Sequence, residues 1–230
     1  MGSARRRPDL VTGPGGTSRR ERIATSAVAT GRGDDGTTGL LYGGRIAKDD
    51  PRVDAYGTVD EAVAALGIAR AELRELAGSD RLPDALADLA DLVLRLQREL
   101  FVVASELAAN PDAWDRLADG VTRVDEPMLA GLEDVLRDME ARMTMPREFV
   151  VPGESRISAA LELARTVLRR AERRLTTLVR GGEVAGPWLA PYVNRAADLL
   201  WVMARVAEQG EARSSTPSRP ERNARRSARA

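Results

Sequence analysis

Apolar residues recur every three or four positions through most of the chain, a spacing typical of amphipathic helices. The pattern is interrupted only at short stretches rich in Gly, Pro, Asn or Asp, which commonly end helices. It predicts five helices, placed at 54–78, 83–109, 125–145, 154–180 and 187–209. Five helices joined by short or medium connections predict an all-α protein, built as an antiparallel five-helix bundle.

The composition supports this architecture and limits the available chemistry. Apolar residues make up 43% of the chain but aromatic residues only 3%, so we expect a core of Leu, Val and Ala, which favours helices. The chain contains no His and no Cys, which excludes disulfides, Cys–His zinc sites, thiol nucleophiles and His-based catalytic triads. A ferritin-like di-iron site is also excluded, because it needs Glu-x-x-His motifs.

Charge is distributed unevenly along the 230-residue chain, although the formal net charge is zero. Residues 1–22 and 209–230 each contain six Arg and two acidic residues, which leaves a net charge of −8 between 23 and 208. We therefore expect one helical domain at 23–208 between two disordered Arg-rich tails. Such tails can contact nucleic acid, but disorder explains their Arg-, Ser- and Pro-rich composition better, and nucleic acid is not an expected partner.

No apolar run approaches the roughly 18 residues that a membrane span requires. The Arg-rich start also lacks the apolar region of a secretory signal. We therefore expect a soluble, cytoplasmic protein with no membrane partner.

A Gly-rich segment precedes the first expected helix, and its residues 31–36 form a G-x-G-x-x-G pattern. A dinucleotide-binding fold needs this pattern between a strand and a helix, whereas the Thr-Thr-Gly-Leu sequence that follows does not begin a helix. A Walker A loop is excluded because no Gly-Lys-Ser/Thr ends the segment. Closely spaced glycines can still direct backbone N–H groups at an anion, assisted by the hydroxyl groups of Thr37 and Thr38 and by the charge of Lys48. In such a site, Asp34 and Asp35 would hold a divalent cation or position the loop. The alternative is a Gly-rich surface turn.

A cluster of Arg residues lies on the fourth expected helix, in the stretch LARTVLRRAERRL at 163–175. At 100° per residue, Arg165, Arg169 and Glu172 lie together beside the apolar stripe, with Arg173 close by, whereas Arg170 points away. Arg residues four positions apart repel one another unless an anion or a carboxylate lies there, and guanidinium groups suit a triphosphate. The alternative is a solvated face on which Glu172 pairs with its Arg neighbours.

The fifth expected helix carries polar residues on one face, namely Asn194, Asp198, Trp201 and Arg205. The alternative is a purely structural role, in which Asn194 caps the helix and Asp198 and Arg205 form an ion pair. Three polar segments able to hold an anion within one small bundle nevertheless indicate a binding function.

Together these segments resemble the signature of the PduO-type ATP:cob(I)alamin adenosyltransferases. The matching motifs follow in order over roughly 23–208 and are Gly33-Asp34-Asp35-Gly36-Thr37-Thr38-Gly39-Leu40, Lys48-Asp49-Asp50-Pro51, Ala55-Tyr56-Gly57-Thr58-Val59-Asp60-Glu61, Phe149-Val150-Val151-Pro152-Gly153, Arg169-Arg170-Ala171-Glu172-Arg173 and Asn194-Arg195-x-x-Asp198. The resemblance implies a five-helix bundle that forms a homotrimer with active sites between adjacent subunits. It also implies transfer of the 5′-deoxyadenosyl group of ATP, accompanied by magnesium, to cob(I)alamin, with release of triphosphate.

The resemblance further implies roles for individual residues. The loop from Thr30 to Thr38 would wrap the nucleotide, and Lys48 would contact its phosphates. Asp60 and Arg165 match a pair that meets across the subunit interface, and Phe149 matches the aromatic residue that removes the lower axial ligand of the corrin. The other implied nucleotide-site residues are Gly31, Gly33, Asp34, Thr37, Arg169, Arg170, Glu172, Arg173, Asn194 and Asp198. Magnesium is expected to bind mainly through ATP, so no protein metal ligand is assigned.

The sequence departs from the family pattern at several positions. Arg32 replaces a small polar residue, residues 23–29 lack the usual aromatic residues, and Ala196, Ala197 and Trp201 are further replacements. Three hypotheses follow. The first is an adenosyltransferase, and the second is a non-catalytic carrier that binds ATP and adenosylcobalamin; either would pass adenosylcobalamin to a dependent mutase. The third is a helical scaffold whose basic tails bind nucleic acid. The presence of the four residues that match the family's catalytic positions favours the enzyme; they are Asp60, Arg165, Arg169 and Phe149.

Overall fold

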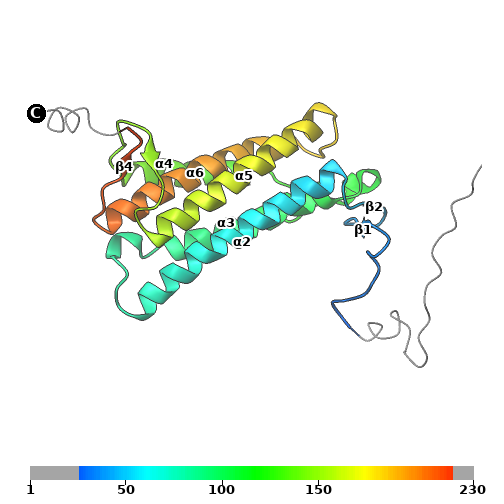
Figure 1. Cartoon of the computed structure of the whole chain (residues 1–230). Coiled ribbons are helices and arrows are strands. Elements are labelled where there is room, and N and C mark those ends of the chain that lie inside the picture. Colours follow the sequence, from blue (N-terminus) through cyan, green and yellow to red (C-terminus); the bar gives the residue numbers. More distant parts are fainter. Residues whose placement is uncertain (1–25, 220–230) are drawn as a thin grey trace, which may run out of the picture.

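The computed structural model describes residues 26–219, whose framework is a bundle of five long helices (Figure 1). The helices are α2 (Pro51–Gly78), α3 (Leu89–Ala108), α4 (Glu126–Ala141), α5 (Arg156–Arg180) and α6 (Leu189–Gly210). Consecutive helices run in opposite directions; α5 packs against both α2 and α6, while α3 packs against α2 and α4 against α6. The predicted all-α antiparallel bundle is therefore confirmed. No helix in the described part of the chain is both long and apolar enough to cross a membrane.

Short elements lie at the two ends of the bundle. Strands β1 (Thr37–Gly39) and β2 (Arg45–Ala47) form an antiparallel hairpin before α2. Strand β3 (Val150–Val151) pairs antiparallel with β4 (Thr216–Pro217) at the opposite end (Figure 1). Two 3-10 turns, η1 (Asp84–Leu86) and η2 (Pro111–Arg116), precede and follow α3. The Gly-rich segment and the segment that carries Phe149 are thus held at opposite ends of the bundle.

Side-chain caps fix where the helices begin. The carboxylate of Asp50 accepts a hydrogen bond from the amide of Arg52 at 2.8 Å, and Pro at the next position suits the first turn of α2. The hydroxyl of Ser155 accepts a bond from the amide of Ser158 at 3.1 Å, and the hydroxyl of Ser158 accepts one from the amide of Ser155 at 3.2 Å. This reciprocal capping box satisfies backbone donors that a helix start otherwise leaves unpaired.

Helix boundaries differ from the predicted ones where distant segments intervene. Helix α3 begins at Leu89 rather than Pro83, because η1 turns the fully buried Leu86 against the end of α6. A Cβ at Gly210 would lie 2.6 Å from Leu86 Cδ2, so the absence of a side chain there permits this close approach. Helix α4 ends at Ala141 rather than near 145, and Arg142 instead donates to both carboxylate oxygens of Asp88, at 2.7 and 2.9 Å.

The C-terminal segment also differs from its expectation, because disorder was expected from residue 209. Residues 209–219 instead finish α6 and form β4, whose pairing with β3 attaches the segment to the bundle. The expectations for residues 1–22 and 220–230 lie outside the described residues.

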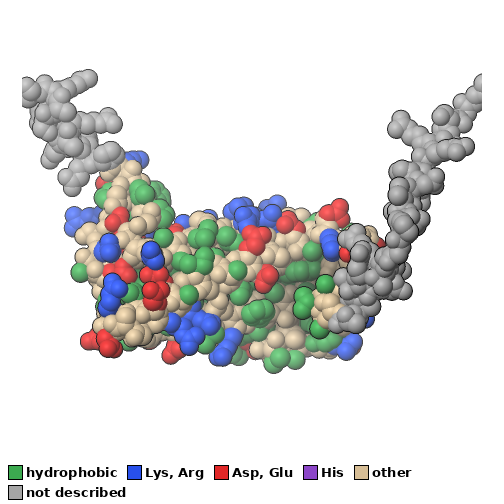
Figure 2. Space-filling model, turned by 60° about the horizontal axis from the view of Figure 1, so that its bottom comes forward, with side chains coloured by type: hydrophobic (Ala, Val, Ile, Leu, Met, Phe, Trp, Pro, Cys, Tyr) green, Lys and Arg blue, Asp and Glu red, His purple; other side chains and the backbone are tan. Residues whose placement is uncertain are grey.

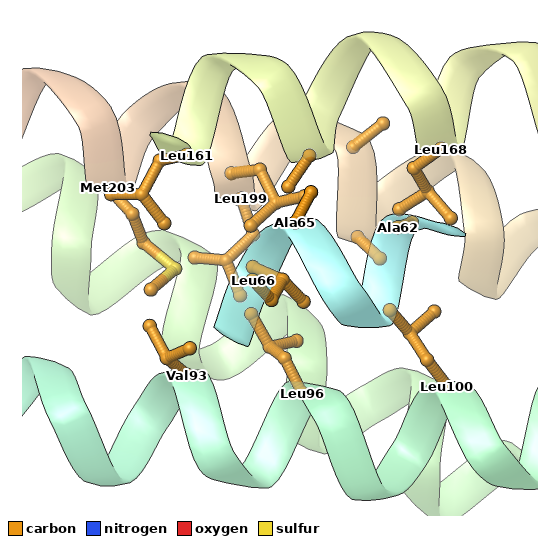
Figure 3. Packing of buried hydrophobic residues seen from close by; sticks show 14 of the residues in the cluster. Ala62, Ala65, Leu66, Val93, Leu96, Leu100, Leu161, Leu168, Leu199 and Met203 are labelled. Atoms are coloured by element: carbon orange, nitrogen blue, oxygen red, sulfur yellow. The ribbon is translucent and has the colours of Figure 1, made fainter. Parts of the chain in front are cut away.

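The apolar core lies where α2, α3, α5 and α6 face one another (Figure 3). The labelled side chains point towards a common centre, and they are Ala62, Ala65, Leu66, Val93, Leu96, Leu100, Leu161, Leu168, Leu199 and Met203. Leu66, Leu161 and Leu168 are fully buried. Close packing of this kind makes the bundle sensitive to the loss of even a few methyl groups.

We expect Leu66→Ala to lower the free energy of unfolding by about 2–5 kcal/mol, because it removes buried contacts and leaves a cavity. Urea unfolding followed by circular dichroism measures this change. Val121→Ala is the control, since Val121 is 67% exposed and its truncation should change stability by less than about 0.5 kcal/mol. Equal effects of the two substitutions would contradict the position of the core.

Candidate active site

Helix α5 carries a polar face beside its buried stripe, as its periodicity predicts. Arg165 is partly buried and donates from Nε to Glu162 Oε2 at 2.6 Å. Arg169 is exposed one turn further along, and its backbone oxygen accepts a hydrogen bond from Arg173 Nη1 at 3.0 Å. The two arginines therefore project from the same stretch of α5, with only Arg165 held by a carboxylate.

A cavity of about 900 Å³ opens beside these arginines. Its walls come from α5, α6, the loop that leads into β3, and the end of the described chain. The lining side chains include Phe149, Glu162, Arg165, Arg169, Asp198, Trp201 and Arg219. Phe149 is 88% exposed, so a large aromatic surface is left open at the edge of the cavity. Such a cavity can take a ligand with an extended apolar face and negative charge.

A chain of hydrogen bonds joins α5 to α6 next to this cavity. Asn194 Nδ2 donates to Glu172 Oε1 at 2.9 Å. Arg195 donates to Asn194 Oδ1 at 2.5 Å and to Glu133 Oε1 at 3.2 Å. Asn194 lies inside α6 rather than at its start, so the interpretation of Asn194 as a cap is wrong. Within residues 26–219, Glu172 is bonded to Asn194 and forms no ion pair with an Arg.

Asp35 organises the Gly-rich loop. Its Oδ1 accepts hydrogen bonds from the amide and the hydroxyl of Thr37, at 3.0 and 2.8 Å. Arg45 donates from Nε to the Thr37 hydroxyl at 2.9 Å and from Nη2 to the Arg32 carbonyl at 2.6 Å. The bonds from Thr37, with a smaller contribution from Arg45, lower the pKa of Asp35. Because these contacts use the backbone of Arg32, the departure from the family pattern at this position leaves them intact.

Lys48 lies against this loop, as the sequence predicts. Its amide donates to the carbonyl of Gly36 at 2.9 Å, and a Cβ at Gly33 would lie 2.9 Å from Lys48 Nζ. The other predicted loop residues share the same segment, and they are Thr30, Gly31, Asp34, Thr37 and Thr38. No group of three or more acidic side chains is arranged to hold a metal ion in the part of the chain that the structure describes.

Hydrogen bonds to backbone carbonyls fix the Gly-rich loop and the start of α2 to one end of the bundle. The amide of Leu41 donates to the carbonyl of Ala108 at 2.8 Å. The buried guanidinium of Arg52 donates to the carbonyls of Leu107 and Glu183, at 3.0 and 2.7 Å. The start of α2 is therefore tied to the end of α3 and to the connection between α5 and α6.

A second hollow, of about 680 Å³, lies between this loop and the outer faces of α2 and α5. It is lined by Lys48, Asp54, Glu61, Arg174 and Thr177, among other residues. Arg174 is paired with Asp54, and the predicted nucleotide residue Arg170 is paired with Glu61 of α2. These two ion pairs join α5 to α2 on the side away from the larger cavity.

The described chain does not bring the predicted residues into one site. Lys48 lines the second hollow, whereas Arg165 and Arg169 line the larger cavity, and the two share no lining residue. Asp60 is exposed on α2, and the ion pair of Arg165 is with Glu162 rather than with Asp60. A single chain thus presents two partial sites.

The interpretation of Asp198 and Arg205 as an ion pair is wrong. Arg205 is fully buried, with Nη1 at 3.2 Å from Glu162 Oε1 and Nη2 at 2.7 Å from Glu208 Oε1. A buried guanidinium needs carboxylates beside it, whereas Asp198 is exposed at the cavity. Neither Glu162 nor Glu208 was predicted as a site residue, although Glu162 stands one helical turn before Arg165.

Comparison with known proteins identifies the family of the chain. The family model described as cobalamin adenosyltransferase matches residues 28–207. The chain belongs to the cobalamin adenosyltransferase family. A corrinoid adenosyltransferase from Citrobacter freundii is 38% identical over 181 residues, which cover 79% of this chain and 94% of that protein. A corrinoid adenosyltransferase from Bacillus subtilis is 36% identical over 177 residues, which cover 77% of this chain and 84% of that protein.

Solved structures share the fold. A phenylalanine-to-alanine variant of the PduO-type ATP:corrinoid adenosyltransferase from Lactobacillus reuteri, complexed with cobalamin and ATP, superposes with a TM-score of 0.70 at 26% identity. That match covers 83% of this chain and 98% of the other. An arginine-to-lysine variant of the Lactobacillus reuteri enzyme, complexed with ATP, gives a TM-score of 0.69 at 26% identity. That match covers 84% of this chain and 100% of the other.

We expect Asp35→Ala to speed amide hydrogen exchange at Thr37 several-fold, because the acceptor that orders the turn is lost. Asp34→Ala is the matched control, since Thr37 donates its amide and hydroxyl hydrogen bonds to Asp35 and not to the neighbouring Asp34. Because the pKa of Asp35 is lowered in the fold, its contribution is complete at neutral pH and is lost as the pH falls below about 4. Equal exchange in both variants would contradict the role of Asp35.

Proposed function

We propose that this chain transfers the 5′-deoxyadenosyl group of ATP to cob(I)alamin at sites completed between adjacent copies of the chain. The reaction class follows from family membership, and the protein is an ATP-dependent corrinoid adenosyltransferase. The observation that carries the proposed assembly is the separation of the predicted residues into two partial sites at different places on one chain. A homotrimer with sites between subunits would bring the loop of one copy to the arginines of the next.

The Gly-rich loop is proposed to hold the nucleotide. Lys48 Nζ lies against Gly33, and Arg45 and Asp35 keep the hairpin in shape. Backbone amides and an ammonium group suit a polyphosphate. Arg169 of the adjacent copy would add a guanidinium group, while Asn194 and Glu172 hold the neighbouring surface of α5 and α6 in place.

The larger cavity is proposed to hold the corrin. Its volume of about 900 Å³ lies in the range of small-molecule sites, and its mouth carries Phe149 and Trp201. Phe149 is the proposed aromatic residue of the lower corrin face, and its 88% exposure supports a position that a ligand covers. Asp198 would contribute a polar group to the same wall.

The proposed reaction needs no general base. The electron pair of cob(I)alamin forms a bond from cobalt to the 5′ carbon of ATP, which oxidises cobalt from the +1 to the +3 state. The carbon–oxygen bond breaks, its electron pair leaves with triphosphate, and no proton is transferred. The protein therefore has to align the reactants and neutralise the leaving group, which Lys48, Arg165 and Arg169 can do. Magnesium would arrive bound to ATP, and a chain without His and Cys is suited to this task.

Surface composition supports assembly. Ile68 on α2 and Phe101 on α3 are each 57% exposed. Figure 2 shows hydrophobic side chains exposed on one face between separate groups of Lys and Arg. Exposed apolar residues of this kind favour contact with another protein surface. We further propose that adenosylcobalamin passes from the assembled enzyme to a mutase that depends on it.

Arg169→Ala should lower kcat/KM for ATP by about 100-fold or more, because a charged contact to the leaving triphosphate is lost. The measurement follows the conversion of cob(I)alamin to adenosylcobalamin spectroscopically under anaerobic conditions. Arg180→Ala is a control, since Arg180 is an exposed arginine in the last turn of the same helix and lines neither cavity. Unchanged kinetics of the Arg169 variant would rule out its proposed role.

Co-expression of Asp60→Ala and Arg165→Ala chains tests whether sites form between copies. Each variant alone should be nearly inactive. In trimers that contain both chains, isolated through two different tags, one site in three combines an intact Asp60 with an intact Arg165, so activity should return to about a third of the wild-type value. Mixed trimers as inactive as the separate variants would contradict sites shared between copies.

A further inference from the structure

Arg205, Glu162 and Glu208 form a buried ionic cluster between α5 and α6. Arg205 and Glu208 are fully buried, and Glu162 is 3% exposed. Arg205 reaches Glu162 through Nη1 and Glu208 through Nη2. The Arg205 guanidinium also lies 5.5 Å from the ring of Trp201, which itself lines the larger cavity.

Stability alone does not account for this cluster. Moving charged groups out of water costs several kcal/mol per ion, and apolar replacements of similar size are often as stable. The hydrogen bonding of the Arg205 guanidinium is incomplete, because Nε has no partner and Nη1, although 3.2 Å from Glu162, makes no hydrogen bond of good geometry. Buried polar groups that lose hydration and lack some hydrogen-bond partners often serve the function of the protein.

The cluster reaches the cavity through Glu162. The carboxylate of Glu162 faces the buried Arg205 with Oε1 and accepts a hydrogen bond from Arg165 Nε with Oε2. Arg165 has a side chain that is 23% exposed and lines the cavity. A shared carboxylate therefore holds Arg165 in one position, with a buried charge behind it.

The cluster also reaches the chain that carries Phe149. Glu208 accepts a hydrogen bond from the hydroxyl of Ser215 at 2.5 Å. The next two residues form β4, which pairs with β3, and the amide of Ser218 donates to the Phe149 carbonyl at 2.7 Å. One buried group of charges is thus connected to two separate walls of the cavity.

We propose that Glu162, Arg205 and Glu208 are positioning residues, which hold Arg165 and the Phe149 loop at a set separation across the cavity. This inference rests on the proposed function, because it assigns Arg165 and Phe149 to the corrinoid site. Glu162 and Arg205 act on catalysis through Arg165, and Glu208 acts through Ser215 and β4. A displacement of about 1 Å in a catalytic group can lower a rate about 100-fold.

A double-mutant cycle tests the first connection. Glu162→Gln keeps the shape of the side chain but weakens its hold on Arg165, so kcat should fall about 10- to 100-fold with a smaller change in KM for ATP. In an Arg165→Ala background, whose small residual rate is measured in single turnovers with the enzyme in excess, the same substitution should cause no further loss, because the residue it acts through is already absent. Multiplied losses in the double variant would show a general structural effect and overturn the proposal.

Arg205 gives an independent comparison. Arg205→Lys keeps the buried charge and should retain more activity than Arg205→Met, which leaves two carboxylates uncompensated. If Arg205→Met does not fold, the double-mutant cycle of Glu162 and Arg165 still tests whether the buried cluster acts through Arg165. Asp134→Asn is the control, because it removes a charge from the exposed ion pair with Arg137. Neither residue lines the cavity, so kcat should stay unchanged.

Ser215→Ala tests the second connection. It should lower activity that starts from cob(II)alamin and a reductant several-fold more than activity that starts from cob(I)alamin, since the proposed role of Phe149 lies in preparing cob(II)alamin for reduction. Equal losses from both starting states, or no loss from either, would overturn this connection. A wild-type protein without turnover would instead refute the proposed function before any variant is compared.

Discussion

Helix α5 is packed on two sides, and this constraint sets the geometry of both partial sites. Its apolar stripe is buried against α2 and α6, so the helix cannot rotate without exposing Leu161 and Leu168. The same constraint fixes the direction of every arginine on its remaining surface. Arg165 and Arg169 therefore reach the larger cavity, while Arg170 and Arg174 pair with carboxylates of α2.

Much of the fold was predictable because its determinants are local. Periodic apolar residues and caps such as Ser155 specify the helices within a few residues. The hairpin formed by β1 and β2 was not predictable, because strands of three residues carry no period and depend on Arg45 reaching back to Thr37. The start of α3 was misplaced for a similar reason, since Leu86 is turned inwards by its contact with Gly210, more than a hundred residues away.

The sequence identified the candidate site residues but not which of them one chain brings together. Helical spacing places Arg165 and Arg169 on a common face, and the structure agrees. Periodicity contains no information about partners on other helices, such as Glu61 for Arg170 or Glu162 for Arg205. Periodicity also cannot separate a site within one chain from a site between copies. The expectation that Lys48 and Arg169 lie at separate places on one chain came only from the family resemblance.

The proposed reaction and the composition of the chain together give a reason for the buried charges of Glu162, Arg205 and Glu208. In the proposed reaction the nucleophile is the corrinoid itself, so the contribution of the protein is alignment and charge neutralisation rather than proton transfer. A bundle of Leu and Ala can align groups only through the direction of its side chains, and a surface arginine has many rotamers. A carboxylate held from behind by a buried guanidinium reduces that freedom, because Glu162 can move only if Arg205 loses one of its two carboxylate partners. The proposed rigidity of Arg165 is thus obtained from a cluster that apolar residues of similar size often match in stability.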